Sequence, residues 1–388
     1  MARRIATGID IGTSQIKVVV VEEIRDKRER FLRVLGTGLA ESRGLRQGYV
    51  VNKEEVTEAI REAKRQAEAA SRVPIRSAFL AVGGISIDEA RATGETIIGR
   101  ADQVVSSIDI EKAGAAAHEA ATPHFLNRRV LHDIPLEYRL DGAKVMGNPS
   151  GMKGVRLEVD YLFVSVLTQH LETLIHAVEG TEVEVIDQMA ATLAGANVLL
   201  TKDQQRRGCL LANLGAETTS IVVFDEGVPV SIKVIPMGSA DITNDIALGL
   251  RISLDEAERV KTGRLTGAMY PRKKVDALIE RRLEDICEVV EKHLKSLNRR
   301  GPLPAGVIIA GGGAAQSAIT DIVRSALKLP ARLAEFRLTN DPKLRDATWA
   351  VAYGLALWGL TGETESHKNS WPSEVVRSAT QFFKQFLP

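Results

Sequence analysis

The feature that most constrains the fold lies near the N-terminus, where two apolar runs flank a short polar turn. Residues 9–17 read Ile-Asp-Ile-Gly-Thr-Ser-Gln-Ile-Lys, and four consecutive valines occupy positions 18–21. An apolar run that enters a turn with one glycine and two hydroxyls, followed by a β-branched run, predicts a strand, a tight turn and a second strand. The core of the chain is therefore expected to begin with a β-hairpin.

This turn has the chemistry of a phosphate-binding loop. Gly12 lets the backbone approach a ligand closely, and Thr13 and Ser14 add hydroxyls beside free N–H groups. Asp10 is placed to hold a hydrated divalent cation such as Mg²⁺. The turn is not a Walker A loop, because no Gly-Lys-Ser/Thr opens a helix, and it is not a dinucleotide fingerprint, because a second strand follows the glycine. Taken alone, the pattern is more typical of a plain hairpin turn.

The same pattern returns in the second half of the chain. Residues 211–223 read Leu-Ala-Asn-Leu-Gly-Ala-Glu-Thr-Thr-Ser-Ile-Val-Val, so that Asn213 falls where Asp10 fell and Gly215 where Gly12 fell. Two phosphate-type hairpins, one in each half, predict a duplicated α/β fold that binds a nucleotide between its halves.

Composition excludes several classes of protein. Among 388 residues, Lys and Arg number 51 and Asp and Glu number 50, so no bulk charge indicates a nucleic-acid partner. Cys209 and Cys287 have no metal-ligand spacing and are expected to be reduced thiols in the core of a cytosolic protein. Asp10 interrupts the apolar run that follows the basic N-terminus, so we expect no signal peptide. No apolar run of about 18 residues indicates a membrane span.

Three later stretches supply further candidate site residues. Gln188 follows an expected strand at 182–186 and is placed to orient a water molecule near a terminal phosphate. Its neighbour Asp187 is either a site residue or the cap of the next helix. Glu258 and Lys261 share one helix face, either as an ordinary ion pair or as a pair that reaches a ribose or adenine edge.

The third stretch is a run of three glycines after an apolar strand expected at 307–310. Three consecutive glycines cost backbone entropy, and such a turn suits a flat ligand that presses on bare backbone. The run comprises Gly311, Gly312 and Gly313. A helix of small apolar residues at 348–360 is expected to pack back on the first half.

The C-terminal residues predict an amphipathic helix beyond a polar linker. Seven apolar side chains fall in one sector of a helical projection and the polar side chains fall outside it. Such a helix with three phenylalanines on one face is typical of an interfacial membrane anchor; the alternative is a helix that docks on its own domain or on a partner. The apolar sector comprises Val375, Val376, Ala379, Phe382, Phe383, Phe386 and Leu387.

These motifs together resemble the actin-like ATPase superfamily, through the two hairpins, the triple glycine and Ala-Glu-x-x-Lys at 257–261. Within it the chain resembles, over essentially its whole length, the FtsA family of bacterial cell-division proteins. The more specific similarities are Pro-Leu-Glu-Tyr-Arg-Leu-Asp-Gly at 135–142, Asn-Pro-Ser-Gly-Met-Lys-Gly-Val-Arg-Leu at 148–157, the insertion in the first half and the C-terminal helix.

The resemblance implies a mixed α/β, actin-like fold with a small α+β subdomain inserted in its first half. The first half is expected at 1–83 and 162–205, on either side of the insertion at 84–161. The second half is expected at 206–240 and 305–345, on either side of a small helical subdomain at 241–304. The returning helix at 346–360, the linker at 361–372 and the amphipathic helix at 373–388 are expected to follow.

The resemblance also implies ATP with Mg²⁺ between the halves, with Asp10 holding the metal through water. It further implies protofilaments and tethering of FtsZ filaments to the cytoplasmic face of the membrane at the division site. FtsZ, through its C-terminal peptide, would bind the subdomain at 241–304, and later divisome proteins would bind the insertion. The residues expected to contact the nucleotide are Asp10, Gly12, Thr13, Ser14, Lys17, Gly215, Ala216, Glu217, Thr218, Thr219, Gly238, Glu258, Lys261, Gly311, Gly312 and Gly313.

One position departs from the family pattern. The second phosphate loop normally carries Asp-x-Gly, whereas here it reads Asn213-Leu214-Gly215. An amide cannot act as a carboxylate base or add negative charge to a Mg²⁺ shell, so the sequence predicts ATP binding with weak or absent hydrolysis. Gln188 and Asn213 are the candidate catalytic positions. The alternatives are a PilM-like scaffold of type IV pilus assembly, which would not need the C-terminal helix, and a small-molecule kinase of the same superfold.

Overall fold

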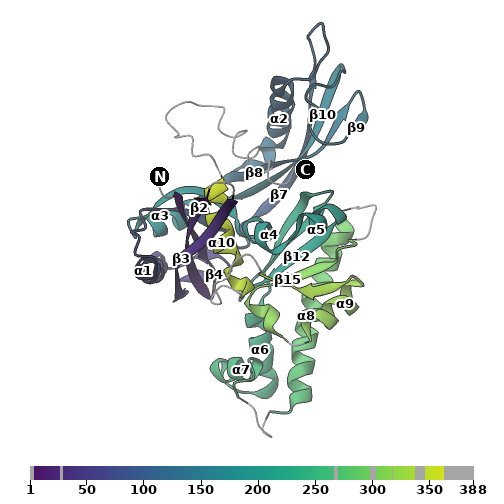
Figure 1. The fold of residues 1–388 in the computed structure, drawn as a ribbon. Helices are drawn as coiled ribbons and strands as arrows, with labels where there is room; N and C mark the ends of the chain where they lie inside the picture. Colours follow the sequence, from purple (N-terminus) through teal and green to yellow (C-terminus); the bar gives the residue numbers. More distant parts are fainter. Residues whose placement is uncertain are drawn as a thin grey trace.

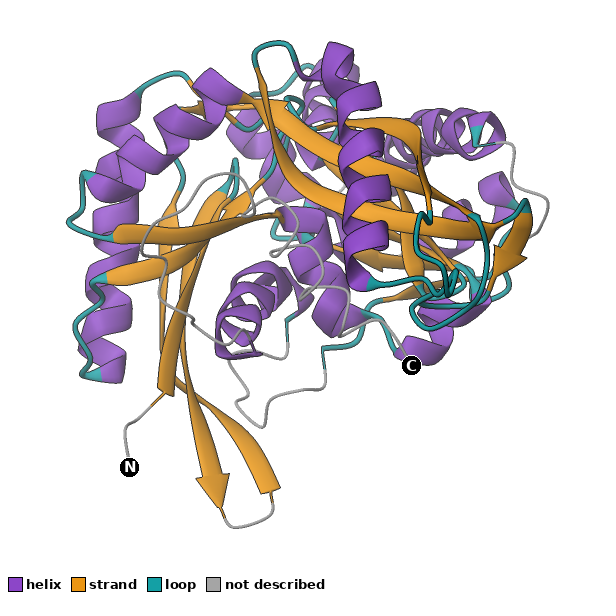
Figure 2. Cartoon of the chain, turned by 90° about the horizontal axis from the view of Figure 1, so that it is seen from above, coloured by secondary structure: helices purple, strands orange, loops and turns teal. Residues whose placement is uncertain are grey.

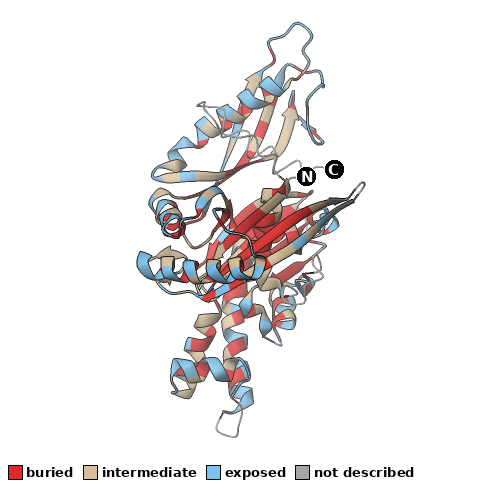
Figure 3. Cartoon of the chain, turned by 60° about the vertical axis from the view of Figure 1, so that its left-hand side comes forward, coloured by how far each residue is buried: buried red, intermediate tan, exposed pale blue. Residues whose placement is uncertain are grey.

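The computed structural model has three tiers, with an inserted sheet at one end, two larger sheets in the middle and a helical subdomain at the other end (Figure 1). Viewed from above, β2 and β3 form a long hairpin that projects from the body (Figure 2). Buried residues follow the sheets, while the outer helices keep one exposed face (Figure 3). The described residues are 4–26, 29–265, 270–297, 303–316, 318–336 and 346–361.

The first sheet carries the N-terminal hairpin in its centre. β1 pairs antiparallel with β2 and parallel with β6, and the strand order is β11-β6-β1-β2-β3. Val18 and Val20 face one side, against helices α1 and α3, while Val19 and Val21 face the other, as the period of a strand requires. The elements are β1 (Arg4–Ile11), β2 (Gln15–Asp26), β3 (Glu29–Glu41), α1 (Lys53–Ser71), β6 (Ser77–Val82), α3 (Thr168–Glu179) and β11 (Glu184–Ala190).

The second sheet repeats the arrangement of the first. Its order is β14-β13-β12-β15-β16, so β12 occupies the place of β1, with an antiparallel hairpin partner on one side and a parallel strand on the other. Its strands are β12 (Cys209–Leu214), β13 (Thr219–Asp225), β14 (Val228–Ile235), β15 (Val307–Ala310) and β16 (Ala331–Leu333). Three helices lie between β14 and β15 in sequence, namely α6 (Ser239–Leu250), α7 (Leu254–Lys261) and α8 (Arg272–Ser296), and α9 (Ile319–Leu327) lies between β15 and β16.

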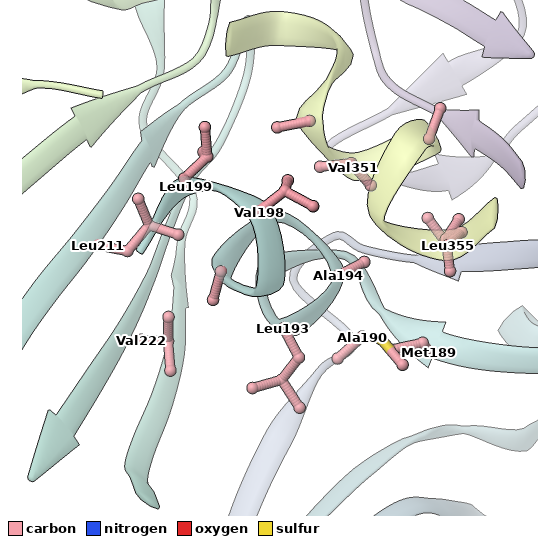
Figure 4. Packing of buried hydrophobic residues seen from close by; sticks show 14 of the residues in the cluster. Met189, Ala190, Leu193, Ala194, Val198, Leu199, Leu211, Val222, Val351 and Leu355 are labelled. Carbon is pink, nitrogen blue, oxygen red and sulfur yellow. The ribbon is translucent and has the colours of Figure 1, made fainter. Parts of the chain in front are cut away.

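Two small-residue helices, α4 (Ala191–Leu199) and α10 (Ala350–Thr361), join the two halves. Leu193 and Val198 of α4 belong to a cluster that also holds Leu211 and Val222 of the second sheet and Val351 of α10 (Figure 4). The close packing of α10 on the first sheet depends on glycine. A Cβ on Gly8 would collide with the carbonyl oxygen of Ala352, and one on Gly354 with that of Ala194.

The insertion is an antiparallel sheet, ordered β7-β10-β8-β9, with α2 on one face. Its strand β10 continues without a break from the insertion into the main body. Tyr161 and Phe163 pack on the α2 side while Leu162 and Val164 pack in the main core, so both faces are apolar and the alternation is concealed. The elements are β7 (Asp88–Ile97), α2 (Ser107–Ala121), β8 (Arg128–Leu140), β9 (Ala143–Val145) and β10 (Arg156–Leu167).

Further short elements include a hairpin of β4 (Leu45–Arg46) and β5 (Tyr49–Val50) and the helix α5 (Lys202–Arg207). Cys209 and Cys287 are both buried and free, as the sequence indicated. Within the described ranges, none of the helices has the length and apolarity that crossing a bilayer would require.

Candidate functional site

The turns of the two matched hairpins have the same geometry. In the β1–β2 turn, the Gly12 N–H donates to the Gln15 carbonyl at 3.1 Å, and in the β12–β13 turn the Gly215 N–H donates to the Thr218 carbonyl at 2.9 Å. A Cβ added to Gly12 or to Gly215 would lie 2.9 Å from that same carbonyl oxygen. Both turns therefore require glycine at this place.

Both turns line a single cavity of about 410 Å³ between the two halves. This volume is within the range of small-molecule and cofactor sites. Most of the residues that the sequence singled out come together there: Asp10, Gly12, Thr13, Ser14, Lys17, Asn213, Gly215, Ala216, Thr218, Glu258, Lys261, Gly311, Gly312 and Gly313.

Asp10 and Lys17 are paired across the first hairpin and form its charged end. Burial raises the pKa of the Asp10 carboxyl to about 6, and the charge of Lys17 opposes this rise. Burial lowers the pKa of the Lys17 ammonium, against the opposing attraction of Asp10 and Asp346. The Lys17 ammonium also lies 5.9 Å from the centre of the Trp349 ring. The cavity thus holds a desolvated carboxylate, which a bound cation would favour in its ionised form.

Asn213 has the place of Asp10 in the second hairpin, and Ser220 has that of Lys17. The second hairpin therefore has no charged pair at this position. The triple-glycine turn packs directly on it, because a Cβ on Gly311 would lie 2.5 Å from Asn213 Oδ1. Gly311 also has a φ of +91°, which only glycine adopts readily.

Glu258 and Lys261 are both an ion pair and part of the cavity wall. Their charged atoms are 2.7 Å apart, and Lys261 Nζ also donates to the Ser239 carbonyl at 3.0 Å and to Thr243 Oγ1 at 2.7 Å. Burial raises the pKa of Glu258, but the hydrogen bonds from Lys261 and Thr243 outweigh it, so the net shift is downward. The pair holds α7 against the first turn of α6.

Three residues expected to contact a nucleotide do not line this cavity. Thr219 is buried, and its hydroxyl donates to the Met237 carbonyl at 2.8 Å. Gly238 allows the start of α6 to approach the second hairpin, since its Cβ would meet the backbone of Ala216. Glu217 lies at the mouth of the cleft, where its carboxylate accepts a hydrogen bond from the backbone N–H of Gln47.

Gln188 is likewise not part of the cavity lining, because β11 runs to Ala190 and places Gln188 inside the strand. The sequence suggested that the strand ends before Asp187, but the buried Met189 and Ala190 complete it. The interpretation of Asp187 as a helix cap is wrong, since α4 has no side-chain cap and the Asp187 carboxylate accepts from the Gln188 N–H at 2.8 Å.

Sequence reasoning missed several residues of the cavity wall. Gly83 and Gly84 follow β6 in the first half, as the triple glycine follows β15 in the second half. The similarity between the two halves was therefore a signal that could have identified them. Thr348 lines the cavity from the turn before α10, and Ala350 and Val351 line it from the start of α10; no local pattern marks these residues. The apolar residues expected to form the membrane helix (375–387) lie outside the described residues.

Comparison with known families gives two matches, which cover separate parts of the chain. The model described as "Cell division protein FtsA" matches residues 210–354, which hold the second hairpin and the start of α10. The model described as "SHS2 domain inserted in FTSA" matches residues 85–165, which hold the inserted sheet.

Curated relatives extend the similarity over most of the chain. The cell division protein FtsA of Bacillus subtilis is 31% identical over 369 residues, which cover 89% of this chain and 81% of the relative. That of Pseudomonas aeruginosa is 29% identical and covers 93% of this chain and 91% of its own. That of Escherichia coli K12 is 26% identical, with 94% of each covered.

Solved structures show the fold. The PilM–PilN type IV pilus biogenesis complex matches with a TM-score of 0.70 at 17% identity, covering 92% of this chain and 99% of that one. MreB5 of Spiroplasma citri bound to ADP matches with a TM-score of 0.52 at 12% identity, covering 92% and 96%. The expected actin-like fold with an inserted subdomain is confirmed. The matches to the two family models and to the curated relatives show that the chain belongs to the FtsA family of cell-division proteins.

Proposed function

We propose that this protein binds ATP with Mg²⁺ in the cleft and acts as a nucleotide-gated scaffold with weak or absent hydrolysis. The observation that carries the proposal is the shared cavity lined by two turns of the same geometry, Gly12–Gln15 and Gly215–Thr218. Paired glycine turns suit a polyphosphate approached from two sides, because successive backbone N–H groups in such turns form anion-binding concavities. MreB5, a neighbour in fold, has been solved with ADP and with AMPPNP.

The residues of the cavity fit a magnesium nucleotide. Asp10 supplies a desolvated carboxylate for a hydrated Mg²⁺, and Lys17 supplies a cation for phosphate oxygens. Lys261 and the bare backbone of Gly311–Gly313 form the wall expected to take the nucleoside. A bound Mg²⁺ would neutralise phosphate charge, while Asn213 offers only a neutral amide at the second hairpin.

Binding and turnover are tested separately. Isothermal titration with ATP in the presence of Mg²⁺ is expected to show one site, and a phosphate-release assay on the same sample is expected to show little turnover. The absence of ATP binding would refute the proposed nucleotide site. Turnover comparable to that of a metabolic kinase would refute the scaffold role.

We also propose that the protein polymerises on the cytoplasmic face of the membrane at the division site and tethers FtsZ there. Membership of the FtsA family supports the role in division. The apolar sector within residues 373–388 supports membrane binding, since three phenylalanines on one face can enter the lipid interface. The helical subdomain with α6, α7 and α8 is proposed to bind the C-terminal peptide of FtsZ, and the insertion to contact later divisome proteins.

The membrane proposal is tested by co-sedimentation with vesicles that contain anionic phospholipid. We expect the full chain to sediment with the vesicles and a chain lacking residues 373–388 to stay in solution. Phe383→Glu and Gln381→Glu are a matched pair, because each adds one negative charge but only the first lies in the apolar sector. Equal sedimentation of the two variants, or of the truncated chain, would favour a scaffold without a membrane helix.

A further inference from the structure

The small hairpin of β4 and β5 has an unusual turn. Gln47 and Gly48 are its two central residues, with φ values of +50° and +90°. Two positive φ values define a type I′ turn, in which Asn, Asp or Gly is usual at the first position. Gln47 is a longer side chain held in a left-handed conformation, so its surroundings must compensate for the backbone strain.

Contacts with the first half hold this turn in place. The Ile85 N–H donates to the Gln47 carbonyl at 3.2 Å. Gly48 lies so close to Gly84 that a Cβ on either residue would collide with the other's backbone. Because Gly48 and Gly84 both line the nucleotide cavity, the tip of the hairpin forms part of its wall.

The tip also makes a direct hydrogen bond to the second half. The backbone N–H of Gln47 donates to Glu217 Oε2, across 170 positions of sequence. Glu217 belongs to the turn that begins at Gly215, the second of the two phosphate-type turns. A carboxylate in such a turn would repel a phosphate, but here it is directed to an N–H group of the opposite half.

We propose that Glu217 is a positioning residue that holds the two halves together at the mouth of the cleft and thereby slows release of the nucleotide. The inference rests on the proposed binding of ATP. Separation of the halves would carry the β4–β5 hairpin away with the first half and break the bond to Glu217. The bond therefore favours the closed cleft, and its loss is expected to speed dissociation more than association.

The experiment measures dissociation of a fluorescent ATP analogue, with Mg²⁺, from the full chain by stopped-flow displacement. Glu217→Ala removes the acceptor, and Glu217→Asp keeps the charge but shortens its reach. Both variants are expected to release the nucleotide about three- to tenfold faster, the range for loss of a partly exposed hydrogen bond to a charged group. Glu217→Gln keeps an acceptor oxygen, and Gln47→Asn keeps the N–H and tolerates positive φ, so both are expected within about twofold of the parent.

A different pattern would overturn the proposal. If Glu217 only repelled phosphate, Glu217→Ala and Glu217→Gln would both slow release and Glu217→Asp would match the parent. Amide hydrogen exchange of residues 44–51 without nucleotide gives a second readout, in which Glu217→Ala is expected to expose the Gln47 N–H. Unchanged protection of the Gln47 N–H refutes the hydrogen bond even if the parent chain fails to bind ATP. Failure of the nucleotide site is therefore distinguishable from failure of the Gln47–Glu217 hydrogen bond.

Discussion

The carboxylate of Glu89 accepts a hydrogen bond from the backbone N–H of Ile232, with the two atoms 2.6 Å apart. Glu89 belongs to β7 of the insertion and Ile232 to β14, the edge strand of the second sheet. The other oxygen of Glu89 accepts from Ser231 Oγ at 2.9 Å, and that hydroxyl also contacts His293 Nε2 of α8 at 2.8 Å. Glu89 of the insertion thus accepts hydrogen bonds at the open edge of the second sheet, and Ser231 connects this contact to α8.

This contact predicts a measurable loss of stability when the carboxylate is removed. Burial raises the pKa of Glu89, and the hydrogen bonds from Ile232 and Ser231 oppose that rise, so the group is desolvated and depends on its partners. Glu89→Ala is expected to lower the free energy of unfolding in urea by about 1–3 kcal/mol, because the Ile232 N–H and the Ser231 hydroxyl lose their acceptor. Glu95→Ala, on the exposed part of the same strand, is the control and is expected to cost less than about 0.5 kcal/mol. Equal effects would show that Glu89 does not fasten the insertion.

The close packing of α10 predicts an asymmetry between two glycines. Gly8→Ala would drive a methyl group into the Ala352 carbonyl, so we expect a loss of about 2–4 kcal/mol, in the range of severe overpacking. Gly99→Ala has open space around its Cβ and is expected to change stability by less than about 0.5 kcal/mol. Thermal unfolding of the two variants compares them. A neutral Gly8→Ala would mean that α10 can move away from the first sheet at little cost.

Asp133 in the insertion predicts a pH dependence of stability. Burial raises the pKa of Asp133 to about 7 from its ordinary value of 3.8. Between these pH values the unfolded chain loses the proton while the folded chain keeps it, so stability falls as pH rises and stays low above pH 7. Asp133→Asn removes this loss. The free energy of unfolding of the variant minus that of the parent, measured in urea, is expected to be roughly 1–4 kcal/mol larger at pH 8 than at pH 5. An equal difference at both pH values would contradict this assignment.

Restoring the carboxylate in the second hairpin tests why turnover is expected to be weak. Asp has the size of Asn, so Asn213→Asp changes the charge beside Gly311 while it preserves the shape of the turn. We expect phosphate release to rise about tenfold or more, because a carboxylate supplies the base and the negative charge that an amide lacks. ATP binding serves as the control and is expected to persist in both proteins. Unchanged release with intact binding would mean that other groups limit hydrolysis.

The sequence predicted the two hairpins and their glycines because these signals are local. Asp10 stands near the end of β1, just before the turn whose hydrogen bond joins Gly12 to Gln15, and Asn213 and Gly215 repeat this arrangement. A duplicated pattern also predicts that the two turns share a cleft, since duplicated halves present equivalent edges. The triple glycine after β15 is also a local signal. Three consecutive glycines cost backbone entropy, and the run can be recognised from the sequence alone.

The sequence was less informative where distant contacts decide the outcome. Gln188 was expected at a strand end, but the buried Met189 and Ala190 extend β11 past it. Glu217 was expected at the nucleotide, whereas its partner Gln47 lies 170 positions away in a hairpin that no periodicity relates to it. Such pairings depend on how the two halves meet, which local propensity does not specify.

Helix α10 gives the cleft a mechanical connection to the end of the described chain. It begins with Ala350 and Val351 in the cavity wall and runs, buried for most of its length, to Thr361. Its twelve residues span about 18 Å. Force applied to the polypeptide beyond Thr361 would therefore act, through α10, on the wall of the proposed nucleotide cavity. Tension at the proposed membrane anchor would act on the wall of the proposed ligand site, so load is expected to change the rate at which the nucleotide is released.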